Sequence, residues 1–265
     1  MRSNHPPKLV GVLHLAPLPG SPLSAEAADE IARAAAQDAS LLQASGFDTV
    51  IVENFGDAPF LPRVGAVTVS AMTLAAMRVR DACPALSLGV NVLRNDAEAA
   101  LAVAVVVGAS FVRVNVHVGA RVTDQGVIEG GAGMTLRTRR ALGATGVEIW
   151  ADVDVKHSAA LGPRPIADEA LDATVRGLAS AILVTGEGTG RPVDRQKLCD
   201  VRQVVSVPVY VASGATIALL PALAEVSDGV VVGSALCRDG RAGGRVDAGR
   251  AASFARAFHE AYSRS

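Results

Sequence analysis

The sequence predicts a single closed (β/α)₈ barrel that spans residues 1–265. Eight short apolar runs alternate along the chain with eight helix-like segments, and no linker of disordered composition interrupts them. Such alternation is typical of a parallel sheet with helices outside it. The chain has 265 residues, of which 50% are hydrophobic and 3% aromatic. Eight units in this length fit a closed barrel better than an open, doubly wound sheet.

Each predicted strand is a short apolar run, and each predicted helix has apolar residues at three- and four-residue steps. We predict strands at 8–15, 49–53, 86–92, 111–116, 148–153, 181–184, 208–212 and 229–232. The first helix is expected to be capped by Ser24 and to end at Gly46, since these residue types favour the two ends of a helix. The other helices are predicted at 67–83, 96–107, 135–142, 166–177, 195–204, 217–225 and 247–263.

Composition excludes several classes of protein. With 25 basic and 26 acidic residues, the net charge is −1, so the chain lacks the excess of positive charge that is typical of proteins binding nucleic acid or an anionic membrane. The longest apolar passage, Ala99–Val107, is shorter than the ~20 residues that span a bilayer. Cys83, Cys199 and Cys237 form no C-x-x-C pair, which favours a reducing compartment and no zinc site. We expect a soluble cytoplasmic homo-oligomer with a small-molecule substrate.

The stretch from Gly146 to Ser158 concentrates ionisable residues at a strand end. Asp152 and Asp154 share one face of the strand, because side chains alternate with period two, and Lys156 and His157 follow at once. A lone carboxylate here would be a structural ion-pair partner. Four ionisable groups within six residues favour a catalytic site instead.

Polar residues also end the other strands. In a (β/α)₈ barrel, function gathers at the carboxyl ends of the strands. Strand parity turns Arg113 inward, one step below Asn115, where it could neutralise Glu53 or Asp152. The alternative is a buried ion-pair network that binds no ligand. The residues near the ends of the first seven strands are His14, Glu53, Asn91, Asn115, Asp152, Thr185 and Ser213.

Two glycine-bearing turns follow the last two strands. Ser213 and Gly214 come after the seventh strand, and Gly233 and Ser234 after the eighth. Many barrels bind phosphate in these two loops through backbone N–H groups. The alternative is that both are only tight turns. The T-G-E-G-T-G run at 185–190 matches neither a Walker A loop nor a dinucleotide fingerprint.

The longest predicted loop follows the fourth strand. Its T-D-Q-G-V-I-E-G stretch mixes charged residues with glycines, and connections of this length are usually functional or disordered. We predict a mobile lid over Thr123–Gly131 that carries Asp124, Gln125 and Glu129 towards a ligand and excludes water on closing.

Several long motifs follow one another along the chain. They are G-V-L-H-L-A-P-L-P-G-S-P (11–22), E-N-F-G-D-A-P-F (53–60), G-V-N-V-L-R-N-D (89–96), F-V-R-V-N-V (111–116), T-D-Q-G-V-I-E-G (123–130), A-D-V-D-V-K-H-S (151–158) and L-V-T-G-E-G-T-G (183–190). Over nearly the whole chain, these motifs resemble those of the BtpA/SgcQ family.

The resemblance implies a ribulose-phosphate-binding-type barrel. The family takes its name from a cyanobacterial role in photosystem I biogenesis, yet close relatives sit in sugar-metabolism gene neighbourhoods and look like enzymes. The S-G-A-T turn at 213–216 departs from the family's G-S-G-V-T pattern.

Two functions of different classes remain open. The first is an enzyme of lyase, isomerase or nucleosidase type acting on a small phosphorylated or sugar-like metabolite. Asp152 or Glu53 would be the acid or base, Lys156 an electrostatic or Schiff-base group, and His157 a proton shuttle. A divalent metal could use Asp154 with these groups, but no spacing marks a metal site, so we predict no cofactor. The second is a non-catalytic assembly factor for a membrane complex.

Overall fold

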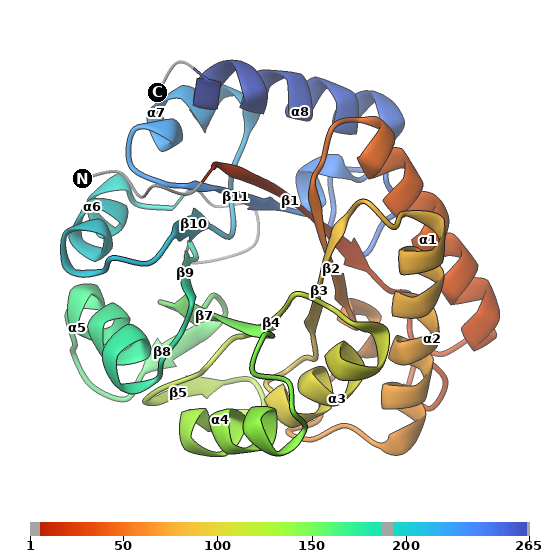
Figure 1. Ribbon diagram of the computed structural model, residues 1–265, viewed down its shortest axis with the longest axis horizontal. Helices are drawn as coiled ribbons and strands as arrows, with labels where there is room; N and C mark the ends of the chain where they lie inside the picture. Colours follow the sequence, from red (N-terminus) through yellow and green to blue (C-terminus); the bar gives the residue numbers. More distant parts are fainter. Residues whose placement is uncertain (1–5, 187–192, 264–265) are drawn as a thin grey trace.

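The computed structural model describes residues 6–186 and 193–263, and its eight main strands close into a parallel barrel (Figure 1). The strand order around the barrel is β1-β11-β10-β9-β7-β4-β3-β2, which confirms the predicted (β/α)₈ fold. The barrel strands are β1 (Lys8–His14), β2 (Thr49–Glu53), β3 (Ser87–Asn91), β4 (Phe111–Val114), β7 (Glu148–Val153), β9 (Ala181–Val184), β10 (Val209–Val211) and β11 (Gly229–Val232).

Helices surround this barrel on the outside (Figure 1). They are α1 (Ala28–Ala44), α2 (Ala66–Ala82), α3 (Ala97–Val107), α4 (Ala132–Ala141), α5 (Ile166–Leu171), α6 (Arg195–Val204), α7 (Leu220–Ala224) and α8 (Ala248–Ser263). Short 3₁₀ turns cover Phe55–Asp57, Ile217–Leu219 and Ser234–Leu236, and a π-helical turn covers Asp172–Arg176. Among the described residues, no helix combines the length and the apolar character needed to cross a membrane.

Two apolar cores hold the barrel together. The larger one packs the outward faces of the strands against the helices. The smaller one fills the barrel interior, where Phe111 stacks on Trp150 at a centroid distance of 3.7 Å and Trp150 contacts Tyr210. These aromatic rings fill the barrel interior next to the amino-terminal ends of the strands, and the polar strand-end residues lie at the opposite, carboxyl-terminal end.

Some helix boundaries differ from the predicted ones for local reasons. Helix α1 begins at Ala28, not after a cap at Ser24, because the Glu30 carboxylate accepts a hydrogen bond from the Ala27 N–H and supports the start there. Gly46 ends the helix as predicted, with a left-handed φ of +98°. The segment predicted as one helix at 166–177 changes from α-helix to the π-helical turn after Leu171.

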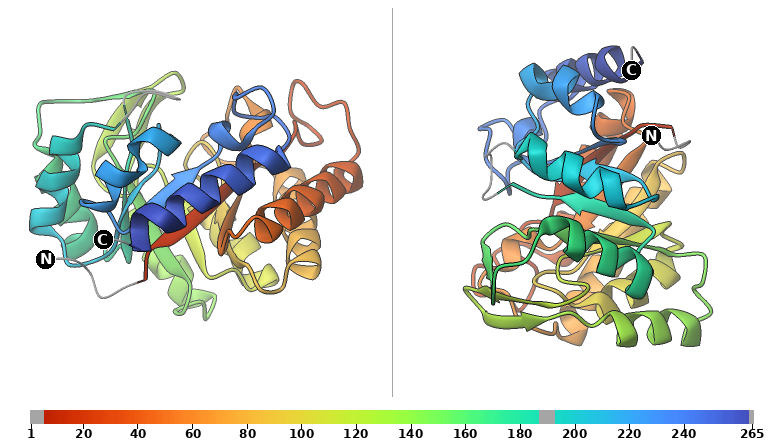
Figure 2. Two further views of the ribbon diagram at one scale, coloured as in Figure 1. Left: turned by 90° about the horizontal axis from the view of Figure 1, so that it is seen from above. Right: turned by 90° about the vertical axis from the view of Figure 1, so that its left-hand side faces the viewer.

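The connection after β4 is a folded β-hairpin and not a loop. Strands β5 (Ala120–Thr123) and β6 (Gly126–Glu129) pair antiparallel, and β8 (Ser158–Ala160) pairs with β5 from the other side. The prediction of a loop after the fourth barrel strand was therefore wrong in its secondary structure, because residues 120–129 form two paired strands. The left view of Figure 2 shows this hairpin rising from the same side of the barrel as the β1–α1 and β11–α8 connections.

Candidate active site

The polar centre of the barrel is an ion pair between β4 and β7. Arg113 donates to both carboxylate oxygens of Asp152, from Nε at 2.9 Å and from Nη2 at 2.8 Å, and the Asn115 side-chain amide donates to Asp152 Oδ2 at 2.9 Å. The Asp152 side chain is 0% exposed. Burial disfavours the Arg113 cation, but Asp152 outweighs it and raises the pKa of Arg113 above its ordinary value. Asp152 therefore lies below the rim of the barrel, and both of its carboxylate oxygens accept hydrogen bonds.

Glu53 lies above this pair and joins three strands. The Asn91 amide donates to Glu53 Oε2 at 2.8 Å, and Arg113 Nη1 lies 3.8 Å from the same oxygen. The imidazole Nε2 of His14 lies 3.8 Å from the other carboxylate oxygen. Neighbouring strands deliver these groups in register, since His14 pairs with Glu53 and Glu53 with Asn91. The structure brings Glu53, Asn91, Asn115 and Asp152 together in one network through Arg113.

His14 and Lys156 both have a pKa below the ordinary value of their side chain. Burial lowers the pKa of His14 below its ordinary value of 6.5, and Glu53 opposes this only in part. Burial also lowers the pKa of Lys156, and the Arg113 cation lowers it further. Among the described residues, no hydrogen bond or ion pair engages Lys156 Nζ, and His14 Nδ1 is buried without a partner.

A cavity of about 240 Å³ opens at this mouth. Glu53, Arg113, Lys156 and His14 line it. The two glycine turns also line it, with Ser213, Gly214, Ala215, Gly233, Ser234 and Ala235. The predicted phosphate loops and four of the predicted side chains therefore share one cavity.

The glycine turns present unused backbone donors to the cavity. No described residue accepts a hydrogen bond from the N–H of Gly214, Ala215, Ser234 or Ala235. Gly214 adopts a left-handed φ of +69°, which other residues adopt rarely. A Cβ at Gly233 would lie 2.6 Å from His14 Cε1, so only glycine fits beside the imidazole. The turns can surround an anion with N–H groups.

Other predicted site residues lie outside this cavity. Thr185 is fully buried and donates to the main-chain oxygen of Asp154 at 2.5 Å, so it supports the end of β7. His157 is exposed at the rim with a left-handed φ of +56°. Asp124 is exposed in the hairpin, and Gln125 and Glu129 line a second cavity beside it.

Two arginines near the mouth were not predicted. Arg94 follows β3 directly and is only 6% exposed, and Arg250 from the first turn of α8 lines the mouth cavity. The strand-end rule that selected Asn91 could have found Arg94 three residues later, whereas no local signal marks Arg250. Among the described residues, no three His, Cys, Asp or Glu side chains cluster so as to hold a metal ion.

The fold resembles solved barrels of low sequence identity. The (S)-3-O-geranylgeranylglyceryl phosphate synthase of Thermoplasma acidophilum, solved with its substrate sn-glycerol-1-phosphate, matches with a TM-score of 0.58 and 18% identity, covering 96% of this chain and 94% of that one. This likeness shows the fold alone.

Sequence relatives are much closer. An uncharacterised protein of Thermococcus kodakarensis is 45% identical over 92% of this chain and 92% of its own. The photosystem I biogenesis protein BtpA of Synechocystis is 42% identical over 95% of this chain and 88% of its own. The BtpA family model matches residues 5–260. The chain belongs to the BtpA family.

Proposed function

We propose that this protein is an enzyme that acts on a small phosphorylated metabolite by acid–base chemistry at the barrel mouth. The observation that carries the proposal is Lys156. A partly buried amine with no carboxylate partner among the described residues is costly as a structural element, yet it lines a cavity that unused anion donors also line. Perturbed titratable groups in a cleft are typical of catalytic sites.

The phosphate would lie in the two glycine turns. The free N–H groups of Gly214, Ala215, Ser234 and Ala235 suit an anion. Support also comes from the Thermoplasma synthase, a barrel of the same fold solved with a phosphorylated glycerol. A cavity of about 240 Å³ accommodates a phosphorylated sugar or polyol of a few carbons.

The reacting groups would be Lys156 and Glu53. A lowered pKa increases the neutral fraction of Lys156, the form in which the amine can accept a proton or attack a carbonyl carbon. Glu53 lines the same cavity and would be a second proton-transfer group, oriented by Asn91. This pair suits a lyase, an isomerase or a nucleosidase.

Three further residues would assist this chemistry. Asp152 would act as a positioning residue that holds Arg113, because neither of its oxygens is open to the cavity. The imidazole of His14 would contact the substrate through Nδ1. His157 at the rim would exchange protons with solvent.

A metabolite screen with one matched pair of lysine variants tests the proposal. Lys156→Met should fold with a melting temperature no lower than that of the wild type and lose about 10²–10⁴-fold in turnover, the usual contribution of a general acid–base group. Lys8→Met is the control, because Lys8 packs over Trp150 at the closed end of the barrel. Full turnover by Lys156→Met on every accepted substrate would refute the proposal.

A second function is favoured by one relative. The Synechocystis protein carries the name of a photosystem I biogenesis factor at 42% identity. If this chain is an assembly factor, it will turn over no phosphorylated metabolite. Lys156→Met will then bind the assembling complex as the wild type does.

A further inference from the structure

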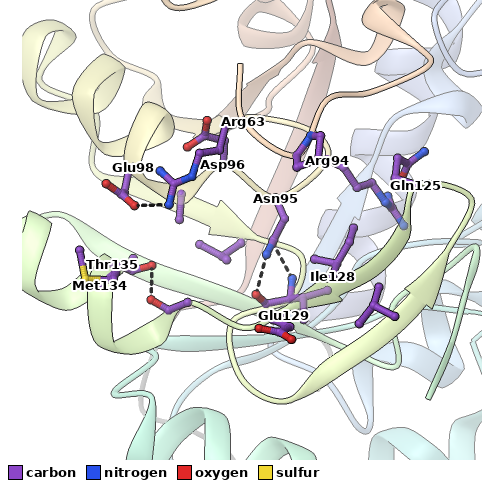
Figure 3. Close-up of a pocket in the computed structure, with 16 residues that line it drawn as sticks. Arg63, Arg94, Asn95, Asp96, Glu98, Gln125, Ile128, Glu129, Met134 and Thr135 are labelled. Atoms are coloured by element: carbon purple, nitrogen blue, oxygen red, sulfur yellow. Dashed lines mark hydrogen bonds and ion pairs between the residues drawn. The ribbon is translucent and has the colours of Figure 1, made fainter. Parts of the chain in front are cut away.

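A second cavity of about 250 Å³ lies beside the mouth, between the start of α3, the β5–β6 hairpin and the start of α4 (Figure 3). Its walls are largely apolar, with Val114 and Val116 from the β4 side and Val127, Ile128 and Met134 from the hairpin and α4. Val127 and Met134 are 55% and 56% exposed. These side chains leave apolar surface in water that a ligand in the cavity would cover.

Arg94 is the one cation lining this cavity that forms no ion pair in the described part of the chain. Its guanidinium makes one hydrogen bond to a described residue, from Nη2 to the main-chain oxygen of Lys156 at 2.8 Å. No described carboxylate lies within 4.0 Å of it, although Arg94 is only 6% exposed, and Asp152, Asp124 and Glu53 act on its charge only from farther away. A buried charge without a paired counterion is unfavourable, so the site favours an anionic ligand group.

The other charged groups around the cavity limit what this anion can be. Arg63 already pairs with Glu98 at 2.9 Å, and this pair lies on the opposite side of the cavity from Arg94 (Figure 3). The Asp96 carboxylate accepts from the N–H groups of Ala99 and Val64. Together with Glu129, these carboxylates would repel a dianion such as phosphate. A ligand with one negative charge and an apolar remainder would match both the Arg94 cation and the apolar walls of the cavity.

We propose that this cavity is a second ligand site that binds a small carboxylate with an apolar body, with the carboxylate on Arg94 and the apolar part against Val116, Val127 and Met134. Arg94 suits this role because its planar guanidinium can bind a carboxylate through two parallel hydrogen bonds. The site adjoins the mouth through Lys156, whose main-chain oxygen holds Arg94 and whose side chain lines the mouth cavity.

Binding of matched acids and amides by the full chain tests this site. The probes are benzoate, phenylacetate and 3-methylbutanoate, each against its neutral amide, measured by ligand-observed and protein-observed NMR. At least one acid should bind saturably, about ten-fold or more tighter than its amide, because only the acid can form the charge-assisted bonds. Its shift changes should centre on Arg94, Val127 and Met134. No saturable binding by any acid up to about 10 mM, or equal affinity of acid and amide, overturns the proposal.

Two variant pairs locate the binding. Arg94→Gln should lose about ten-fold or more in affinity, whereas Arg63→Gln in the same cavity should bind as the wild type does, since Arg63 is already paired. If Arg94→Gln does not fold, Val127→Glu and Val127→Gln replace it at an exposed position. The glutamate should abolish binding by repulsion while the glutamine retains it. Equal losses within either pair would place the ligand elsewhere and overturn the proposal.

Discussion

At the scale of single residues, burial separates the ionisable groups of the barrel mouth into two kinds. Asp152 and Arg113 satisfy one another in the interior, and Asn115 completes the pair. Lys156, which lies four residues after Asp152, has no such partner among the described residues. We expect the Arg113–Asp152 pair to position neighbouring groups, and the Lys156 amine to take part in the reaction.

Removing the Asp152 carboxylate should therefore cost stability. Asp152→Asn strands the Arg113 cation in the interior, and loss of one partner of a buried pair typically costs ~3–5 kcal/mol in the free energy of unfolding. Urea denaturation followed by circular dichroism measures this loss. The sequence alone favoured a catalytic role for Asp152, and an unchanged unfolding midpoint would restore that interpretation.

Removing the Lys156 amine should have the opposite effect on stability. Its folded pKa is lower than the unfolded one, so between these two values the unfolded chain binds more protons and stability rises with pH. Lys156→Met should be more stable than the wild type near pH 7, and the difference should shrink as the pH rises towards 10.5. Unfolding curves at several pH values test this. A difference that stays constant with pH would show that Lys156 is not perturbed.

At the scale of elements, the hairpin after β4 is the main departure from the predicted fold. The sequence showed glycines and charges at 123–131 but not the partner strand β8, which lies 35 residues further on, from Ser158. Arg121 joins these parts, because its Nε donates to Ser158 Oγ at 2.6 Å and its Nη1 pairs with Glu169 at 3.3 Å. Long-range pairing of this kind leaves no local periodicity to read.

The hairpin should resist hydrogen exchange without any ligand. Amides paired between β5 and β6 should be protected in the free protein, in contrast to a mobile lid. Arg121→Ala should speed their exchange about ten-fold, the equivalent of about 1.4 kcal/mol of local stability, because it removes the link to Ser158 and Glu169. Rapid exchange throughout 120–129 in the wild type would show that the lid interpretation was right.

At the scale of the whole molecule, the barrel was predictable because each strand carries its own signal. The bounds of β2, β7, β9 and β11 agree with the predicted ones residue for residue. Strand parity also gave the inward positions of Glu53, Asn91 and Arg113. The second cavity could not be predicted, because it forms only where α3, α4 and the hairpin meet. The T-G-E-G-T-G run lies outside the described residues from position 187 on.

Close packing of the barrel interior gives a test of the fold. A Cβ at Gly89 would lie 2.2 Å from the Phe111 ring, so Gly89→Ala should destabilise the protein by about 1–3 kcal/mol through overpacking. Gly146→Ala is the control, since nothing lies within 4 Å of its added Cβ. Chemical denaturation compares the two variants, and equal stability of both would contradict the filled barrel interior.

We propose that the mouth cavity binds an anion in the glycine turns, close to the Lys156 amine. The most direct measurement is an NMR titration with sn-glycerol-1-phosphate that follows both the backbone amides and the Lys156 side chain. We predict saturable shifts at Gly214, Ala215, Ser234 and Ala235, together with a rise in the pKa of Lys156 from its lowered value, because a nearby anion favours the ammonium form. Unmoved amides, or a Lys156 that titrates at its ordinary value with and without the phosphate, would contradict it.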